Sequence, residues 1–435
     1  MSPELVGVFG IAIALCLMAL RVPIAIALGS VSVVGIFVLR GQNAAFGALQ
    51  SLPFDFATNW TLAAIPMFLL MGSLSYQSGL TASLYSAARV WLGGVPGGLA
   101  VATTFASAGF AAASGSSVAT SAAMGRVAIP EMLQHNYDKG LAAGSVAAAG
   151  TLGALIPPSI AFVIYGWYTE QSVSALLIAG ILPGILTAVA YATMIIIRCK
   201  INPELAPGSR DKPRKGERLD TLLRVWPMPL LIMAIIGSIY TGVATPSESA
   251  AVGTVAAAVI AFLQGRLNSS VLRDSVSDAV ATTASLFFIA VGAVLLTRFL
   301  ALAGIPTAMS SFLVGMAADP FLVILALSVV FLVLGMFLDP MGLMLLVLPI
   351  FLPAFKALGI DLIWMGVIVV KYIEIGLITP PVGMNAFVVK SVVGNAIPLT
   401  TIFRGLGWFI ACEIVVVGLL LAFPQISLWL PGLMR

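Results

Sequence analysis

Long apolar stretches follow one another along almost the whole chain, separated by short turns that contain proline, glycine or charged residues. A bilayer-spanning helix needs about 20 apolar residues, so stretches of this kind are typical of membrane crossings. We predict ten crossings in two sets of five. The first set is 5–20, 22–39, 54–77, 141–167 and 174–198, and the second is 222–240, 247–264, 278–302, 362–392 and 405–430.

Two other apolar segments, 96–132 and 320–357, are interrupted near their middles by polar or turn-forming residues. Both are too long for one simple crossing, and non-helical backbone at membrane depth survives only where protein, water or an ion satisfies its polar groups. This pattern predicts a re-entrant helical hairpin, which enters the membrane, turns and leaves by the same face.

Composition supports a membrane protein and argues against an enzyme. The chain has 435 residues, of which 60% are hydrophobic and 9% charged, whereas soluble domains carry about 25% charged residues. Three cysteines (Cys16, Cys199 and Cys412) and the single histidine, His135, are far apart in the sequence. They form neither a disulfide framework nor a ligand cluster for zinc or haem, so we expect no cofactor beyond a coupling ion.

Basic residues mark one side of the membrane. The polar linker 198–224 holds eight of the 21 basic residues and is predicted to be cytoplasmic. If the predicted crossings are counted in both directions from this cytoplasmic linker, 16 basic residues lie inside, and both termini lie outside. Four basic residues lie outside, namely Arg40, Arg298, Lys356 and Arg435, and Lys371 lies within a crossing. This asymmetry supports five crossings plus one hairpin in each half.

The two halves also match each other at a constant offset of 223 residues. The matched positions are Pro157 with Pro380, Pro158 with Pro381, Gly153 with Gly376, and Ser116 with Asp339. Isolated prolines coincide by chance in a chain with 25 of them, but a Pro-Pro pair, its upstream glycine and a hairpin tip rarely coincide together. We therefore predict an all-α polytopic protein with a first repeat at 1–197 and a second at 225–435. Because five is an odd number, the second repeat is predicted to be inverted, as in secondary transporters.

Four breaks at mid-membrane depth are predicted to form the functional site. Proline and glycine there free backbone oxygens, which suit Na⁺, and helix N-termini attract a carboxylate. We expect two sodium sites, each made by one hairpin tip and the neighbouring broken helix, with Ser114, Ser116 and Thr379 as foremost ligands. The candidate sodium- or substrate-binding residues are Ser114, Gly115, Ser116, Ser117, Gly153, Ile156, Pro157, Pro158, Gly335, Asp339, Gly342, Thr379, Pro380, Pro381, Gly383 and Asn385. The alternative interpretation is that the prolines only kink helices and the serines only pack.

Ionisable residues inside the crossings are further candidates. Lys371 and Glu374 lie three residues apart, which predicts an ion pair on one helical face. Asp339, at the second hairpin tip, has three open interpretations: a cation ligand, a proton carrier or a helix N-cap.

Four ordered segments resemble one known family. They are GFAAASGSSVATSAAMGRVAIP (109–130), YDKGLAAGSVAAAGTLGALIPPS (137–159), IPMFLLMGSLSYQSGL (65–80) and GLITPPVGMN (376–385). The resemblance is to the large membrane subunit of the tripartite ATP-independent periplasmic (TRAP) transporters, the DctM type, and it covers essentially the full length.

The resemblance implies sodium-driven import of an organic acid, such as a C4-dicarboxylate, a keto acid or a sialic acid, across the bacterial inner membrane. It implies two partners, a DctP-type periplasmic substrate-binding protein and a small four-helix DctQ-type subunit. No such helices precede Met1 here, so we expect the small subunit to be a separate chain. It further implies an elevator mechanism, in which the hairpins and the broken helices 141–167 and 362–392 move, with 80–91 as an amphipathic arm.

Three other classes remain as alternatives. A channel would use the same broken backbone to line a pore. A stand-alone carboxylate carrier with related hairpins would need no binding protein. A membrane enzyme is the weakest alternative, because no nucleophile with a base, and no metal constellation, recurs in the crossings.

Overall fold

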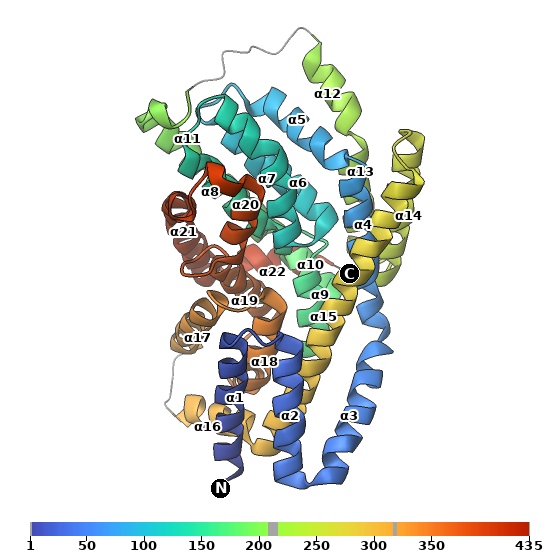
Figure 1. Cartoon of the computed structure of the whole chain (residues 1–435), viewed down its shortest axis with the longest axis vertical. Helices are drawn as coiled ribbons and strands as arrows, with labels where there is room; N and C mark the ends of the chain where they lie inside the picture. Colours follow the sequence, from blue (N-terminus) through green and yellow to red (C-terminus); the bar gives the residue numbers. More distant parts are fainter. Residues whose placement is uncertain (1, 208–215, 316–319, 435) are drawn as a thin grey trace.

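The computed structural model describes residues 2–207, 216–315 and 320–434, and within these ranges its regular elements are helices (Figure 1). This confirms the all-α prediction. Helices follow from the apolar stretches because, in hydrocarbon, a chain segment satisfies its own N–H and C=O groups only by helical hydrogen bonds. The first half contains α1 (Pro3–Ala19), α2 (Ile24–Arg40), α3 (Gln42–Ala57), η1 (Trp60–Ala63), α4 (Ala64–Gln77), α5 (Leu80–Leu92), α6 (Gly98–Ser114), α7 (Ser117–Gln134), α8 (Lys139–Gly150), η2 (Thr151–Ala154), α9 (Ile160–Thr169), α10 (Val173–Ala179) and α11 (Ile181–Ile201).

The second half has a similar order of elements. After the short turn η3 (Pro203–Leu205), it contains α12 (Glu217–Val225), α13 (Pro227–Tyr240), α14 (Pro246–Leu263), α15 (Ser269–Ala303), α16 (Ile305–Gly315), α17 (Pro320–Gly335), α18 (Pro340–Ala357), α19 (Leu362–Gly376), α20 (Met384–Val393), η4 (Gly394–Ala396), α21 (Leu399–Ala422) and α22 (Gln425–Gly432). Residues 208–215, which belong to the predicted basic linker, and Arg435, which was predicted to lie outside, are not among the described residues.

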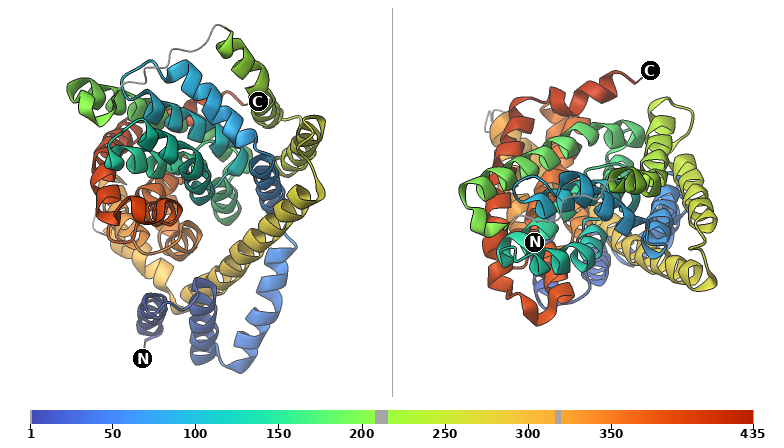
Figure 2. Two further views of the ribbon diagram at one scale, coloured as in Figure 1. Left: turned by 45° about the horizontal axis from the view of Figure 1, so that its top comes forward. Right: turned by 90° about the horizontal axis from the view of Figure 1, so that it is seen from above.

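The helices form two groups on opposite sides of the molecule. Helices α4, α13 and α14 gather on one side, and α8, α19 and α21 on the other (Figures 1 and 2). The long helix α15 runs obliquely between the two ends and packs along α2 and α4 (Figure 1). The hairpins and broken helices therefore lie beside a frame of longer helices.

The two halves interlock around the hairpins. Helix α20, which follows the second break, packs on α7 and α8 of the first half, and α21 also packs on α8. Conversely, α9, which follows the first break, packs against α18 and α19 of the second half. Each broken helix therefore contacts elements of both halves.

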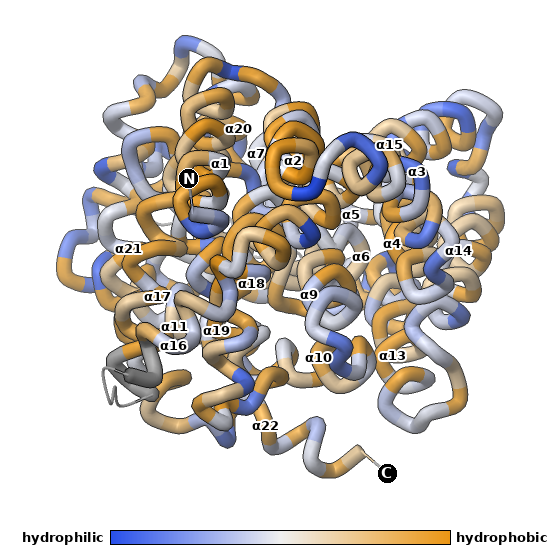
Figure 3. Tube along the Cα trace, turned by 90° about the horizontal axis from the view of Figure 1, so that it is seen from below, coloured by the Kyte–Doolittle hydropathy of each residue, from blue (hydrophilic) through white to orange (hydrophobic). Residues whose placement is uncertain are grey.

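Large apolar side chains cover much of the outer surface. Phe9 and Phe37 are each 54% exposed, and Ile414 is 68% exposed. Hydrophobic segments run along the outer helices α1, α2 and α21 (Figure 3). Among the described residues, five helices are long and apolar enough to cross a membrane, or up to seven if two bent pairs each count as one span. These features are those of a multi-pass membrane protein, and the count of ten crossings stays a prediction.

Several predicted boundaries were wrong. The crossing at 54–77 is part of a longer unit that starts at Gln42 and bends by 54° between α3 and the segment of η1 and α4. The crossing at 405–430 is two helices, α21 and α22, separated at Phe423–Pro424, where proline cannot continue the hydrogen-bond ladder. Helices α12 and α16 were not predicted, because each is short.

Candidate functional site

The first hairpin tip is rich in hydroxyl groups that bond to one another. Helix α6 ends at Ser114 and α7 begins at Ser117, with Gly115 in a left-handed conformation (φ +60°) between them. The Ser114 and Thr120 hydroxyl oxygens are 2.9 Å apart, and the Ser116 hydroxyl accepts a hydrogen bond from the Ala119 amide at 3.4 Å. Ser116 therefore acts as the N-cap of α7, and its φ and ψ are extended.

The backbone of this tip packs directly against the first break, which is the segment between α8 and α9 that includes η2. A Cβ atom added at Gly153 would lie 2.7 Å from the carbonyl carbon and oxygen of Ser116, so only glycine permits this approach. The amide of Ile160, which opens α9, lies 3.5 Å from the carbonyl oxygen of Gly115. The chain between η2 and α9 contains a cis Pro157–Pro158 bond. The fold thus brings Ser116 and Gly153 together.

The second hairpin tip is organised differently. Asp339 Oδ2 accepts hydrogen bonds from the amides of Met341 and Gly342, at 3.0 and 3.1 Å, so Asp339 is the N-cap of α18. Its other oxygen, Oδ1, is buried without a hydrogen-bond partner among the described residues. A Cβ added at Gly376 would lie 2.8 Å from the Cα and carbonyl carbon of Gly335. Hence this tip is also seated on the break of its own half.

The second break leaves one further buried oxygen unused. The Asn385 side chain is fully buried and donates from Nδ2 to the Ala147 carbonyl of α8, at 3.2 Å, while its Oδ1 has no hydrogen-bond partner in the described part of the chain. Thr379 instead donates its hydroxyl to the carbonyl of Ile375, four residues earlier, at 2.6 Å. The Pro380–Pro381 bond is cis, and Gly383 has a φ of +56°.

The predicted ion pair between Lys371 and Glu374 was wrong. Lys371 is fully buried, pairs with Glu413 on α21, and donates to the Thr187 hydroxyl of α11 at 3.0 Å. Glu374 instead accepts a 2.6 Å hydrogen bond from the Ser117 hydroxyl, at the first hairpin tip. Spacing along one helix predicted a local pair, but the neighbouring helix supplies a better-placed carboxylate.

Two residues of this buried cluster were missed in the sequence. Glu413 is 1% exposed and accepts a hydrogen bond from the hydroxyl of Tyr191, on α11, in addition to its pairing with Lys371. An acidic residue in the middle of the apolar segment 405–430 is itself a signal, because ionisable groups inside a membrane are rare. Tyr191 gave no comparable signal.

Not every candidate residue joins the tips. Ile156 packs toward α11, since a Cβ at Gly184 would meet its Cγ1 at 2.7 Å. In the described residues, no hydrogen bond connects the two hairpin tips, and no group of three or more His, Cys, Asp or Glu side chains is placed to hold a metal ion. The oxygen atoms that the breaks offer are hydroxyl, amide, carbonyl and single carboxylate oxygens, a set suited to a hard monovalent cation.

The family follows from a match over nearly the whole chain. Residues 11–426 match the family described as "Tripartite ATP-independent periplasmic transporter, DctM component". The chain belongs to this family. The resemblance seen in the four segments is therefore confirmed, as is the expectation of a transporter permease rather than an enzyme.

Several curated relatives of this chain are also large permease proteins of TRAP transporters. The C4-dicarboxylate TRAP transporter large permease protein DctM of Pseudomonas aeruginosa is 38% identical over 384 residues, which cover 87% of this chain and 88% of that protein. The protein of the same name from Vibrio cholerae is 33% identical and covers 96% of each chain. The sialic acid TRAP transporter large permease protein SiaM of Vibrio cholerae is 31% identical, covering 86% and 87%. Large permeases of this family work with a substrate-binding protein and a small membrane subunit.

Solved structures share the fold at low sequence identity. The YdaH transporter of Alcanivorax borkumensis superposes with a TM-score of 0.63 at 15% identity, covering 100% of this chain and 99% of that one. MtrF of Neisseria gonorrhoeae gives a TM-score of 0.56 at 13% identity, covering 96% and 95%. At such identities the likeness concerns the fold alone.

Proposed function

We propose that this chain is the large membrane subunit of a sodium-coupled importer of an organic acid. One observation carries the proposal: each hairpin tip is seated on the break that follows it, through Ser116 with Gly153 and through Gly335 with Gly376. Two non-helical segments that meet inside a membrane protein concentrate uncommitted backbone oxygens, which is what a coupling cation requires.

A duplicated architecture with inverted repeats is part of the proposal. Helix starts recur after 222 to 225 residues, as the bounds of five pairs illustrate: α2 with α14, α5 with α16, α7 with α18, α8 with α19, and α9 with α20. This recurrence, together with the odd number of predicted crossings per half, supports repeats at 1–197 and 225–435 with opposite orientations.

Two unpartnered oxygens add support for cation sites in the second half. Asp339 Oδ1 and Asn385 Oδ1 are buried and accept no hydrogen bond from the described residues. A buried oxygen without a donor is costly, and a bound cation removes that cost. We propose Asp339 and Asn385 as ligands, with the hydroxyls of Ser114, Ser116 and Thr379 as the predicted ligands beside them.

The substrate class follows from the helix ends and from the relatives. Helices α7, α9, α18 and α20 all begin at a break, and helix N-termini attract anions. The relatives are named for C4-dicarboxylate, sialic acid, isethionate and ectoine, each of which carries a carboxylate or sulfonate. We propose an organic acid of this kind as the substrate.

The elevator mechanism and the partners complete the proposal. The moving unit would contain the hairpins and broken helices, α6 to α9 and α17 to α20, while α1 to α4 and α13 to α15 stay fixed. A separate DctQ-type small subunit and a DctP-type periplasmic binding protein would assemble with this chain in the bacterial inner membrane. One relative, the isethionate permease DctMQ of Oleidesulfovibrio alaskensis, has a name that combines both membrane components.

Uptake by proteoliposomes tests this function. The chain is reconstituted with its small subunit, and labelled succinate and N-acetylneuraminate are presented with and without the binding protein under an inward sodium gradient. We expect uptake above the external concentration, dependent on the binding protein and abolished when an ionophore dissipates the sodium gradient.

Each component of the proposal has its own contrary outcome. Uptake that is unchanged by the ionophore would rule out sodium coupling. Uptake that proceeds equally well without the binding protein would favour a stand-alone carrier. Flux that only equilibrates the two sides would favour a channel.

A further inference from the structure

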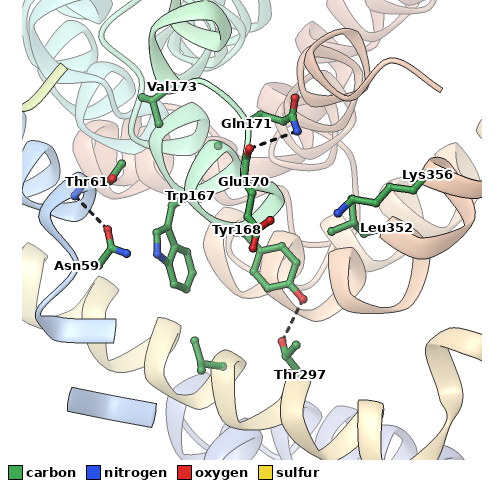
Figure 4. Close-up of a pocket in the computed structure, with 12 residues that line it drawn as sticks. Asn59, Thr61, Trp167, Tyr168, Glu170, Gln171, Val173, Thr297, Leu352 and Lys356 are labelled. Carbon is green, nitrogen blue, oxygen red and sulfur yellow. Dashed lines mark hydrogen bonds between the residues drawn. The ribbon is translucent and has the colours of Figure 1, made fainter. Parts of the chain in front are cut away.

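A pocket with both polar and apolar walls opens between the helices proposed to move and the helices proposed to stay fixed. It has a volume of about 560 Å³ and is lined by residues from η1 and its N-cap, α9 with the loop that follows it, α15 and α18. Figure 4 shows Trp167 and Tyr168 between Asn59 on one side and Lys356 on the other. We call it the outer pocket, because the predicted topology places its lining residues on the outer face of the membrane.

Four separate segments place this pocket on the outer face. In the topology predicted from the basic residues, Asn59 lies at the outer end of the crossing 54–77, and Glu170 lies in the loop between 141–167 and 174–198. Thr297 lies at the outer end of the crossing 278–302, and Lys356 at the outer end of the second hairpin. The four segments are far apart in the sequence, and the fold brings them together around one pocket.

The chemistry of the outer pocket suits an anion. The Lys356 side chain is exposed, its ammonium group points into the pocket (Figure 4), and no acidic oxygen of the described residues lies within 4.0 Å of it. Trp167 and Tyr168 supply flat apolar surface in the same pocket, and a lysine ammonium binds a carboxylate by charge-assisted hydrogen bonds.

An acidic residue narrows the class of anion. Glu170 lines the same pocket and forms no ion pair with any described residue. A second negative group on a ligand would be repelled by it, whereas hydroxyl or ammonium donors on the ligand would be attracted. The combination favours a ligand with one carboxylate and several hydrogen-bond donors over a dicarboxylate.

One hydrogen bond joins the two sides of the pocket. The hydroxyl groups of Tyr168, on α9, and Thr297, on α15, are 3.2 Å apart. Because α9 belongs to the proposed moving unit and α15 to the fixed one, displacement of the unit would separate this pair and change the pocket. A ligand held here therefore lies across the boundary between the two proposed units.

We propose that the outer pocket is a reception site for an organic monocarboxylate that carries hydrogen-bond donors, with Lys356 as the carboxylate contact and Glu170 as the contact that disfavours dianions. This site lies apart from the hairpin tips, and its role in import rests on the proposed transport function.

Binding to the full chain in nanodiscs, without sodium or partners, tests the proposal directly. The probes are N-acetylneuraminate, a monocarboxylate with many hydroxyls, and succinate, a dianion. Quenching of tryptophan fluorescence reports binding, and W167F should remove the signal. We expect N-acetylneuraminate to bind more tightly than succinate, and K356Q to weaken it roughly tenfold, as for the loss of one charge-assisted hydrogen bond.

Matched variants separate charge from nonspecific effects. K356R should retain most of the binding, and R40Q should bind like the wild type, because Arg40 is an exposed basic residue on the same predicted face that does not line the pocket. E170Q should strengthen succinate binding and reduce the difference in affinity between N-acetylneuraminate and succinate.

The outcomes distinguish this site from the proposed function. No quenching by either probe, or equal binding by K356Q and the wild type, overturns the reception site even if sodium-coupled uptake is observed. Binding that depends on Lys356 without any coupled uptake leaves the site standing and overturns the transport proposal.

Discussion

The two hairpin tips lie at equivalent positions in the chain and both cap the helix that follows, but their other side-chain bonds differ. At the first tip, the Ser117 hydroxyl donates to Glu374 of the other half, and Ser114 contacts Thr120. At the second tip, Asp339 bonds to the backbone of its own helix and leaves one oxygen unused. Both tips therefore carry a local N-cap, Ser116 or Asp339, but among the described residues only the first is also bonded through a side chain to the other half.

This difference shows where a duplicated fold loses its symmetry. Ser117 and Pro340 begin the equivalent helices α7 and α18, yet only the serine has a side chain that donates a hydrogen bond. Likewise, the position 223 residues before Glu374 is Thr151, which carries no charge. The backbone breaks recur in both halves. In the part of the chain that the structure describes, the buried charged residues Lys371, Glu374 and Glu413 are linked to the first tip only, through Ser117. We therefore expect the two tips to respond differently when side chains are changed, and alike when the shared backbone contacts are changed.

Removing the buried positive charge of Lys371 should have the largest effect on the stability of the protein. K371M would leave Glu413 buried without its cation, which should destabilise the protein by about 3–5 kcal/mol. The double variant K371M/E413Q should recover most of the loss, because Glu413 is then no longer a buried charge that has lost its cation. Thermal unfolding of the purified protein measures both variants. K200Q, at an exposed position of α11, is the control and should behave like the wild type. A K371M variant as stable as the wild type would contradict the pairing.

Filling the contact between tip and break should harm both tips alike. G153A and G376A each place a Cβ within 2.8 Å of backbone atoms of the facing tip, and overpacking of this kind costs about 1–3 kcal/mol. Both variants should also lower sodium-driven uptake. G407A is the matched control, since a Cβ there meets nothing within 4 Å. If only one variant is impaired, the two tips are not equivalent in this respect.

Removing the hydrogen bond between Ser117 and Glu374, which joins the two halves, should have an intermediate effect on stability. S117A removes the donor to Glu374, and a hydrogen bond that involves a charged group contributes about 1.5–3 kcal/mol. A double-mutant cycle of S117A with E374Q, followed by thermal unfolding, measures the coupling energy between them. Independent, additive effects of the two substitutions would mean that the bond does not fasten this tip.

The smallest change in stability is expected at the second tip, where Asp339 has two separable roles. Asparagine caps helices about as well as aspartate, so D339N should change stability by only a few tenths of a kcal/mol, whereas D339A should cost about 1 kcal/mol. If Asp339 also holds a cation, D339N should raise the sodium concentration needed for half-maximal uptake. Unchanged sodium dependence in D339N would leave Asp339 as a cap alone.

The positions of the helix breaks were predictable because proline and glycine act locally. The helices end at Ser114, Gly335 and Gly376, where the sequence predicted interruptions, since a missing N–H or a residue free to turn interrupts a helix whatever surrounds it. The partner of Lys371 was not predictable in this way. Glu374 is the nearer carboxylate along the chain, but Glu413 is nearer in space because α21 packs against α19.

The sequence by itself determined the class of protein and the four breaks in its helices, because these depend on hydropathy and on local backbone chemistry. The four breaks are 114–117, 153–159, 335–342 and 376–385. Only the tertiary structure decided which polar groups meet. The contact of Ser117 with Glu374, the pair of Lys371 with Glu413, and the assembly of the outer pocket all join segments of different helices. In a chain with so few charges, such pairings depend on how helices pack, and packing is a property of the whole fold.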